Sequence, residues 1–471
     1  MAASPTPVRL HNSLTRRVEP LEPVHPGRVG IYTCGSTVYR YAHIGNLRTY
    51  LFGDLLRRTL EYLGYEVTYV KNITDVGHMR DDATDTGEDR MVIAALEEGK
   101  SPADIAQFYT DAWLEDEALI NIRPADVMPR ATDHITEMLS LIEVLLDKGL
   151  AYESAGNVYF DVSAFPAYGR LSRTRVEAAR AGSRVEVESD KRDPADFALW
   201  KAAEAGRLMH WPSPWGEGFP GWHIECSAMG MKYLGDRFDI HTGGIDLKFP
   251  HHEDEIAQSD GAIGRQVISA WLHGEFLTLA DAKMAKSAGN IIRVSELPEK
   301  GFEPLVFRYL ALTAHYRSKL DFTEEAMHAA ASGLGRLRRA VAGVSESQTI
   351  DLDAEPMASY RARFVAAISE DLGIPTALAV AHAVAGDHAL TPAQRRAQLL
   401  DFDRVLGLGL DQPAALETVG LPEGAAPLLE RRAAARAQRD FAAADALREE
   451  LAAMGVEVRD TPDGQVATRR R

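Results

Sequence analysis

One unit of strand, helix and strand between residues 29 and 70 constrains the fold more than any other part of the chain. Residues 29–35 are a short apolar run that ends in a glycine and predicts a strand. Leucines at helical spacing fill residues 44–63, and Gly64 stands where a helix-terminating glycine belongs. Residues 66–70 predict a second strand. Because a helix that joins two successive strands is typical of a βαβ unit, we expect a parallel sheet.

Polar residues follow both predicted strands at the point where each ends. Cys34 closes the first strand, and residues 72–75, Asn-Ile-Thr-Asp, close the second. Ligands of parallel α/β sheets bind at the carboxyl ends of the strands. The sequence therefore predicts a ligand site around these two strand ends.

The middle of the 471-residue chain interrupts this pattern. Residues 131–205 contain a helix at 132–148, a small β region at 157–162 and a charged, poorly periodic loop at 178–196, and we interpret them as an insertion. The α/β pattern returns at residues 238–241.

The C-terminal third changes character again. From about residue 323 the chain is helical and rich in alanine, arginine and leucine. Residues 411–427, with three prolines, are typical of a linker. A last unit follows, in which residues 428–454 predict one amphipathic helix and the remainder a short strand and turn.

The formal net charge of −17 argues against a general nucleic-acid-binding protein, which usually carries a basic balance. It leaves RNA binding open, because a local basic face can supply phosphate contacts, and arginines cluster at 431–439 and 469–471. No apolar run reaches the ~20 residues of a membrane span, and the N-terminus lacks the layout of a signal peptide. We therefore expect a cytoplasmic protein that binds no membrane.

Two short motifs have the composition of phosphate-binding segments. The motif from His43 to Asn46 (His-Ile-Gly-Asn) opens the predicted helix, where backbone N–H groups and the helix dipole favour anions. The motif from Lys283 to Ser287 (Lys-Met-Ala-Lys-Ser) combines two lysines with small residues, which suits a loop that clamps phosphates. Taken alone, each motif is more often ordinary structure, namely a helix start or a solvated loop.

The only two cysteines, Cys34 and Cys226, belong to a possible metal site. His251 and Glu255 are four positions apart, so on a helix they share one face. Thiolates, imidazoles and carboxylates are all zinc ligands. The residues themselves leave a second interpretation open, in which two inert buried cysteines lie near a solvated acidic helix.

In this order and together, the motifs resemble the cysteinyl-tRNA synthetase family of class I aminoacyl-tRNA synthetases over essentially the whole chain. Both cysteines fall on the zinc positions of that family. The segments that carry the resemblance are residues 32–39, 43–46, 72–75, 129–132, 191–201, 222–226, 239–246, 249–255, 283–287, 440–448 and 460–462.

The resemblance implies an α/β fold with a Rossmann-type catalytic core, an inserted connective domain, a helical bundle and a small C-terminal anticodon-binding module. It places the two halves of the core at residues 1–130 and 206–322, the insertion at 131–205, the bundle at 323–410, and the linker and module at 411–471. The implied ligase activates L-cysteine with ATP, releases pyrophosphate, and transfers cysteine from the adenylate to the 3′ end of tRNA(Cys). We expect a monomer.

The resemblance also assigns residues to ligands. One Zn²⁺ is expected at Cys34, Cys226, His251 and Glu255. Catalytic roles are expected for His43, Asn46, Lys283 and Lys286. ATP, with Mg²⁺, is expected at Thr37, His43, Asn46, Thr49, Gly244, Asp246 and Lys286, and the amino acid at Gly35, Thr74 and Trp222. A substrate thiol would bind zinc as a thiolate, for which the hydroxyl of serine is a poor substitute, so no editing site is needed.

Three positions depart from the family pattern. Asn46 stands where the first motif usually ends in histidine, and we expect retained function with changed donor geometry. Ala285 replaces the usual serine of the second motif. Gly464 is followed by Gln465-Val466-Ala467 rather than by the tryptophan that the family often has, which puts one stacking contact with tRNA in doubt.

Two rival interpretations remain at this point. The cysteine ligase of mycothiol synthesis shares the zinc pocket and the adenylation chemistry but joins cysteine to an amino-sugar, and it lacks the anticodon module. A catalytically silent, regulatory paralogue would explain Asn46 and Ala285. The unit after residue 428 argues against the first rival, and the retained ligands and Lys286 argue against the second.

Overall fold

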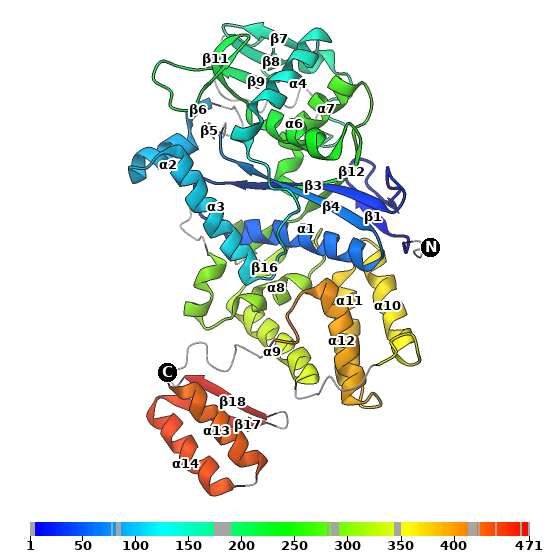
Figure 1. The fold of residues 1–471 in the computed structure, drawn as a ribbon, viewed down its shortest axis with the longest axis vertical. Coiled ribbons are helices and arrows are strands. Elements are labelled where there is room, and N and C mark those ends of the chain that lie inside the picture. Colours follow the sequence, from blue (N-terminus) through cyan, green and yellow to red (C-terminus); the bar gives the residue numbers. More distant parts are fainter. Residues whose placement is uncertain are drawn as a thin grey trace.

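The computed structural model describes residues 5–76, 79–81, 86–173, 190–279, 282–283, 292–342, 350–412, 422, 424–438, 440–461 and 464–469. A parallel sheet lies at the centre of the larger part of the chain. In the view of Figure 1 an antiparallel sheet lies above it, a group of helices below it, and a small C-terminal α/β unit at the bottom.

The central sheet has four parallel strands in the order β13-β12-β3-β4. They are β3 (Arg28–Thr37), β4 (Glu66–Thr74), β12 (Phe238–Gly244) and β13 (Ile268–Gly274). Every residue of β12 is buried, as expected for a strand with both faces covered. The predicted parallel βαβ unit is confirmed.

Helix α1 (Ile44–Tyr62) connects β3 to β4 on one face of the sheet. Its leucines are buried, and Gly64 follows the helix with φ +97°, the left-handed conformation predicted for this glycine. The opposite face carries α6 (Trp222–Leu234) and α7 (His251–Ile263), which lie above the sheet in Figure 1.

Short elements flank this core. At the N-terminus, β1 (Arg9–Asn12) and β2 (Arg17–Pro20) form an antiparallel pair. After β4 come the pair β5 (Met79–Asp81) and β6 (Thr86–Asp89), then α2 (Arg90–Glu98) and α3 (Pro102–Leu119). Short 3-10 helices lie at Ala131–His134, Val162–Ala164, Ile245–Lys248, Val294–Glu296 and Pro298–Lys300.

The insertion is built on a five-stranded antiparallel sheet in the order β10-β11-β9-β8-β7. Its elements are α4 (Ile135–Asp147), β7 (Ala151–Ser154), β8 (Asn157–Phe160), β9 (Phe197–Ala202), β10 (Trp211–Ser213) and β11 (Gly216–Pro220). The sheet runs to Pro220, past the expected end of the insertion at residue 205. Prolines and glycines in β10 and β11 hide these two strands from the sequence pattern. Residues 178–189 of the predicted charged loop lie outside the described residues.

A second small sheet leads into the helical region. It has the order β15-β14-β16, with β14 (Leu277–Leu279), β15 (Ala282–Lys283) and β16 (Leu320–Phe322). The helices are α8 (Pro304–Leu312), α9 (Glu324–Val341), α10 (Met357–Ser369), α11 (Ile374–Gly386) and α12 (Pro392–Leu406). The predicted helical region is confirmed.

A buried ion pair joins the helical region to α1. Asp54 accepts hydrogen bonds of 2.8 Å from Arg58 and from Arg308 of α8. The Arg308 guanidinium also donates to the backbone oxygens of Leu406 and Asn121. One guanidinium therefore joins α8, the end of α12 and the turn after α3 to α1, the helix of the βαβ unit.

The C-terminal unit contains two helices where the sequence predicted one. They are α13 (Ala425–Ala437) and α14 (Phe441–Ala453), followed by the antiparallel strands β17 (Val456–Thr461) and β18 (Gly464–Arg469). The prediction of a single helix is wrong because Asp440 caps a new helix, its carboxylate accepting the Ala443 N–H at 3.0 Å. Residues 413–421 of the expected linker lie outside the described residues.

Within the described ranges, no helix combines the length and the hydropathy that crossing a bilayer requires.

Lys71 of β4 and Glu117 of α3 form a fully buried ion pair with N–O distances of 2.6 and 2.7 Å. We expect Lys71→Met to lower the free energy of unfolding by about 3–5 kcal/mol, because it leaves a buried carboxylate without its counter-charge. The double variant Lys71→Met/Glu117→Leu should recover most of that loss. Urea unfolding followed by tryptophan fluorescence measures both, and a double variant as unstable as the single one would contradict the explanation.

Candidate active site

A cavity of about 230 Å³ opens at the carboxyl ends of the parallel strands. β3, β4 and β12 supply part of its wall, and the rest comes from residues 39–42, from α1, α2, α6 and α7, and from the 3-10 helix at Ile245–Lys248. Its lining includes eleven of the residues predicted from the sequence: Cys34, Gly35, Thr37, Asn46, Thr49, Thr74, Trp222, Cys226, Gly244, Asp246 and His251.

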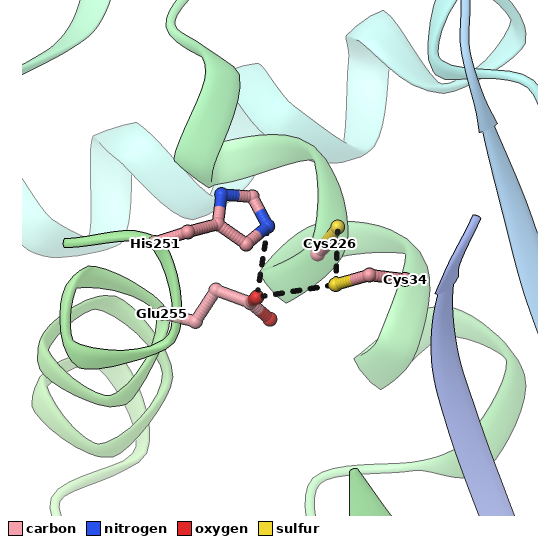
Figure 2. A group of neighbouring side chains, drawn as sticks. All are labelled: Cys34, Cys226, His251 and Glu255. Atoms are coloured by element: carbon pink, nitrogen blue, oxygen red, sulfur yellow. Dashed lines mark hydrogen bonds and ion pairs between the residues drawn. The ribbon is translucent and has the colours of Figure 1, made fainter. Parts of the chain in front are cut away.

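Four side chains meet at the base of this cavity, as Figure 2 shows. The donor atoms of Cys34, Cys226, His251 and Glu255 all lie within 4.8 Å of one another, and all four residues are buried. The two sulfur atoms are 3.9 Å apart, and His251 Nε2 lies 3.1 Å from a carboxylate oxygen of Glu255. The structure thus brings together the four residues that the sequence proposed as one site.

Local structure explains how each side chain arrives there. Cys34 lies where the pairing of β3 with β4 shifts in register, and such irregularities re-aim side chains. Cys226 lies in the second turn of α6. His251 and Glu255 lie one turn apart on α7 and so project from one face.

The group holds negative charge in a buried place. Burial opposes ionisation of the Cys226 thiol, but the hydrogen bond with Cys34 and the charge of His251 outweigh it and lower its pKa to about 6. Burial likewise opposes ionisation of Glu255, but His241 and His251 lower its pKa to about 2. Burial and the neighbouring Cys226 raise the pKa of Cys34 well above its usual value.

His251 supplies the compensating proton. Burial disfavours its charged form, but Glu255 and Cys226 together raise its pKa to about 10. One thiolate and one carboxylate thus share a single imidazolium in a buried site, where an unpaired charge is energetically unfavourable. A divalent cation that displaced this proton would balance the charge and use two sulfurs, one nitrogen and one oxygen as ligands. These residues therefore fit a metal ion.

A partner residue fixes the orientation of His251. The Nδ1 atoms of His251 and His223 lie 2.9 Å apart, and His223 Nε2 lies 3.3 Å from Asp254. The Tyr168 hydroxyl donates to the same Asp254 carboxylate. Such outer contacts hold a ligating imidazole in one orientation, with Nε2 left to face the site.

Sequence analysis missed three further histidines at the back of the site. His252 Nε2 lies 3.3 Å from Cys34 Sγ, and its Nδ1 lies 2.9 Å from His273. His241 Nε2 lies 2.8 Å from Glu255. The position of His241 at the end of a predicted strand was the one sequence signal for this cluster.

His241 and His252 form a second group of possible ligands with Cys34 and Glu255, again within 4.8 Å. Neither histidine lines the cavity, whereas the first group reaches it through both cysteines and His251. A metal ion that contacts a ligand in the cavity therefore belongs to the first group.

The first turn of α1 has a different arrangement from the one expected. His43 Nδ1 accepts the Asn46 N–H, and the Asn46 side-chain oxygen accepts the His43 N–H, both at 3.2 Å. The two residues thus form a capping box. The side-chain oxygen of Asn46 is engaged in this cap, which leaves its amide nitrogen as the available donor.

Burial and the nearby Arg40 lower the pKa of His43 to about 4, so its ring is neutral at pH 7. Because Nδ1 accepts a hydrogen bond, the ring proton resides on Nε2. In β15, the backbone of Lys283 pairs with that of Thr278 in β14. Ala285 and Lys286 lie outside the described residues.

The cavity wall is closely packed at Gly35. A Cβ atom on Gly35 would lie 1.7 Å from the backbone oxygen of Asn72, so only glycine fits. The Asn72 side chain accepts the Gly35 N–H at 2.8 Å and donates to Thr74 at 3.1 Å. The Trp222 ring lies 4.4 Å from that of His251. Asn72 lines the cavity too, although sequence analysis gave it no individual role.

Comparisons with known proteins agree with this geometry. The model of the class I (C) tRNA synthetase catalytic domain matches residues 20–332, and that of the cysteinyl-tRNA ligase anticodon-binding domain matches residues 418–466. Cysteine–tRNA ligase 1 of Burkholderia lata is 48% identical over 98% of this chain and 96% of its own length. The chain belongs to the cysteinyl-tRNA ligase family.

Other members of the cysteinyl-tRNA ligase family are similar over the same extent. The cysteine–tRNA ligase of Thermus thermophilus is 46% identical over 97% of this chain and 98% of its own length. Among solved structures, Mycobacterium tuberculosis methionyl-tRNA synthetase with methionyl-adenylate aligns with TM-score 0.56 and 16% identity, covering 88% of this chain and 96% of that one. That likeness concerns the fold and confirms a class I synthetase core.

We expect Gly35→Ala to weaken metal binding at least about tenfold, because the clash with Asn72 displaces the adjoining Cys34 backbone. Gly386→Ala is the matched control, since a Cβ atom there meets nothing within 4 Å. Titration with Co²⁺, followed by its thiolate charge-transfer absorption, measures the affinity. Equal titration curves for the two variants would refute this prediction.

Proposed function

We propose that this chain is a cysteine–tRNA ligase that forms cysteinyl-adenylate from L-cysteine and ATP and transfers cysteine to the 3′ end of tRNA(Cys). The observation that carries the proposal is the buried group of Cys34, Cys226, His251 and Glu255 beside a cavity, in a chain that belongs to the cysteinyl-tRNA ligase family.

The proposed resident metal is Zn²⁺, held by these four residues. Two sulfurs, one imidazole and one carboxylate suit zinc, and the bound ion supplies an electrophilic centre for the thiol of the substrate. Three ligands reach the cavity wall, so a substrate sulfur has access to the same place. A hydroxyl is a weaker partner for such a centre, which would favour cysteine over serine.

The residues around this centre position the amino acid. Gly35 lines the cavity without a side chain, because a Cβ atom there would overlap the Asn72 backbone, and Thr74 lines the same cavity. Trp222 covers the His251 side of the cavity. These three residues are the proposed cysteine contacts, and Asn72 holds Gly35 and Thr74 in place.

At the other end of the cavity, the start of α1 is the proposed phosphate site. The Nε2–H of His43 and the amide nitrogen of Asn46 can donate to phosphate oxygens there, whereas the backbone N–H groups of His43, Ile44 and Asn46 already have protein acceptors. Thr37, Thr49, Gly244 and Asp246 line the same cavity and are proposed nucleotide contacts. Lys283 and Lys286 are proposed to stabilise charge on the phosphates, and Mg²⁺ is expected to enter with ATP.

In the proposed reaction a carboxylate oxygen of cysteine attacks the α-phosphorus of ATP, and the bond to the pyrophosphate oxygen breaks. A ribose hydroxyl of the terminal nucleotide of tRNA then attacks the acyl carbon, and AMP leaves. Positioning and electrostatic stabilisation account for the rate, since no side chain forms a covalent intermediate.

The acceptor is proposed to be tRNA because residues 418–466 match the anticodon-binding domain of the family. An amino-sugar ligase of the mycothiol type has no use for such a unit. ATP and tRNA as substrates favour a cytoplasmic location, and the proposed site draws on one chain only, which a monomer satisfies.

Zinc should copurify with the protein at about one ion per chain, and Cys226→Ser should lose it. Ser227→Ala is the matched control, because this neighbouring side chain bonds Gln258 at 2.7 Å and is not a ligand. Elemental analysis after dialysis against a chelator measures the content. Zinc retained by Cys226→Ser at the wild-type level would remove this site from the proposal.

Cysteine-dependent exchange of pyrophosphate into ATP tests the activity directly. We expect strong exchange with cysteine, exchange at least about 10⁴-fold weaker with serine, and none in Cys226→Ser. Charging of tRNA(Cys) then identifies the acceptor. A folded, zinc-loaded protein without exchange would instead favour a silent paralogue.

A further inference from the structure

Arg48 is a buried cation in the second turn of α1, and its side chain is not part of the cavity lining. It is 6% exposed. One terminal nitrogen donates to the backbone oxygens of Glu275, at 2.9 Å, and of Phe276, and the other donates to the backbone oxygen of Ser318. A single guanidinium thus holds two separate stretches of backbone.

These two stretches lead into neighbouring parallel strands. Glu275 and Phe276 precede β14, and Ser318 precedes β16. The backbone oxygen of Phe276 also accepts the Leu320 N–H at 3.2 Å, at the point where the two strands begin to pair. Arg48 therefore fixes the start of the small sheet whose third strand, β15, carries the backbone of Lys283.

Two further contacts tie α1 to the same region. The Ile44 N–H donates to the backbone oxygen of Ile292 at 3.0 Å, downstream of β15. The ring of Phe52, one turn after Arg48, stacks on Tyr316 with centroids 4.4 Å apart. Helix α1 is thus attached on both sides of the segment that contains β14 and β15.

The chemistry of the contact favours a geometric role. Burial lowers the pKa of Arg48 to about 10, so the group remains charged at pH 7 although its desolvation is costly. Only arginine offers a planar fork of donors that can reach separate carbonyls at fixed angles, and a lysine offers a single ammonium. The charged guanidinium therefore holds three backbone oxygens in defined positions.

We propose that Arg48 is a positioning residue for adenylate formation, which fixes the distance between the phosphate-binding start of α1 and the strand that carries Lys283. This inference rests on the proposed function of both motifs. A displacement of about 1 Å between groups that act on one transition state lowers the rate by about 10²-fold. Cysteine binding, which involves other elements, stays unchanged.

The test compares Arg48→Lys and Arg48→Met with Arg57→Met in cysteine-dependent pyrophosphate exchange. Arg57 lies on the same helix and also makes several contacts, to Glu61, Pro124 and Asp126, but away from the cavity. Both Arg48 variants should lose at least about tenfold in kcat, Arg48→Met more than Arg48→Lys, with KM for cysteine and zinc content within about twofold of wild type. Arg57→Met should keep its kcat.

A third variant separates positioning from folding. In Arg48→Ala, millimolar guanidinium should partly restore kcat by occupying the vacated place, and the same concentration should leave Arg57→Met unaffected. Unchanged kcat in the Arg48 variants, or equal losses for Arg48→Met and Arg57→Met at equal melting temperature, would overturn the inference. Failure of the proposed function would show separately, as absence of exchange in the wild-type protein.

Discussion

The parallel pairing of β3 with β4 on one side and β12 on the other is the constraint on which the rest of the site depends. Parallel strands end at the same edge of a sheet, so Cys34, Thr74 and Gly244 meet although they are far apart in the chain. The bulge at Cys34 turns its sulfur towards α6 and α7. Every other ligand is then placed by a helix that packs on this sheet.

Charge balance gives the base of the cavity its character. Two thiols and a carboxylate are buried together, and five imidazoles surround them: His223, His241, His251, His252 and His273. Their ring nitrogens can bond buried sulfur and oxygen, and the charged ring of His251 compensates part of the negative charge. These ligand types fit the proposed preference for a thiolate over a hydroxyl.

Helix α1 connects the cavity with the helical region. Its first turn faces the cavity, its second turn carries Arg48, and further along Asp54 binds Arg308 of the helical region. Charged contacts therefore join α1 to the small sheet at Arg48 and to the helical region at Asp54. This arrangement gives a physical reason for a long helix with a buried face directly after β3.

The sequence by itself determined the βαβ unit, the face shared by His251 and Glu255, and, through the ordered motifs, the family. These features depend on the spacing and order of residues along the chain, which a single sequence shows directly. Sequence analysis also missed two local features, the cap that His43 and Asn46 form and the break at Asp440, whose hydrogen bonds span three residues. Tertiary structure alone decided the histidines behind Cys34, the strands up to Pro220 and the clamp of Arg48. Most of these depend on the partner that a side chain or a strand finds in the folded protein, and Arg48 finds its partner 227 positions away. No local pattern of hydrophobicity or turn residues encodes such a choice, because packing of the whole core fixes it.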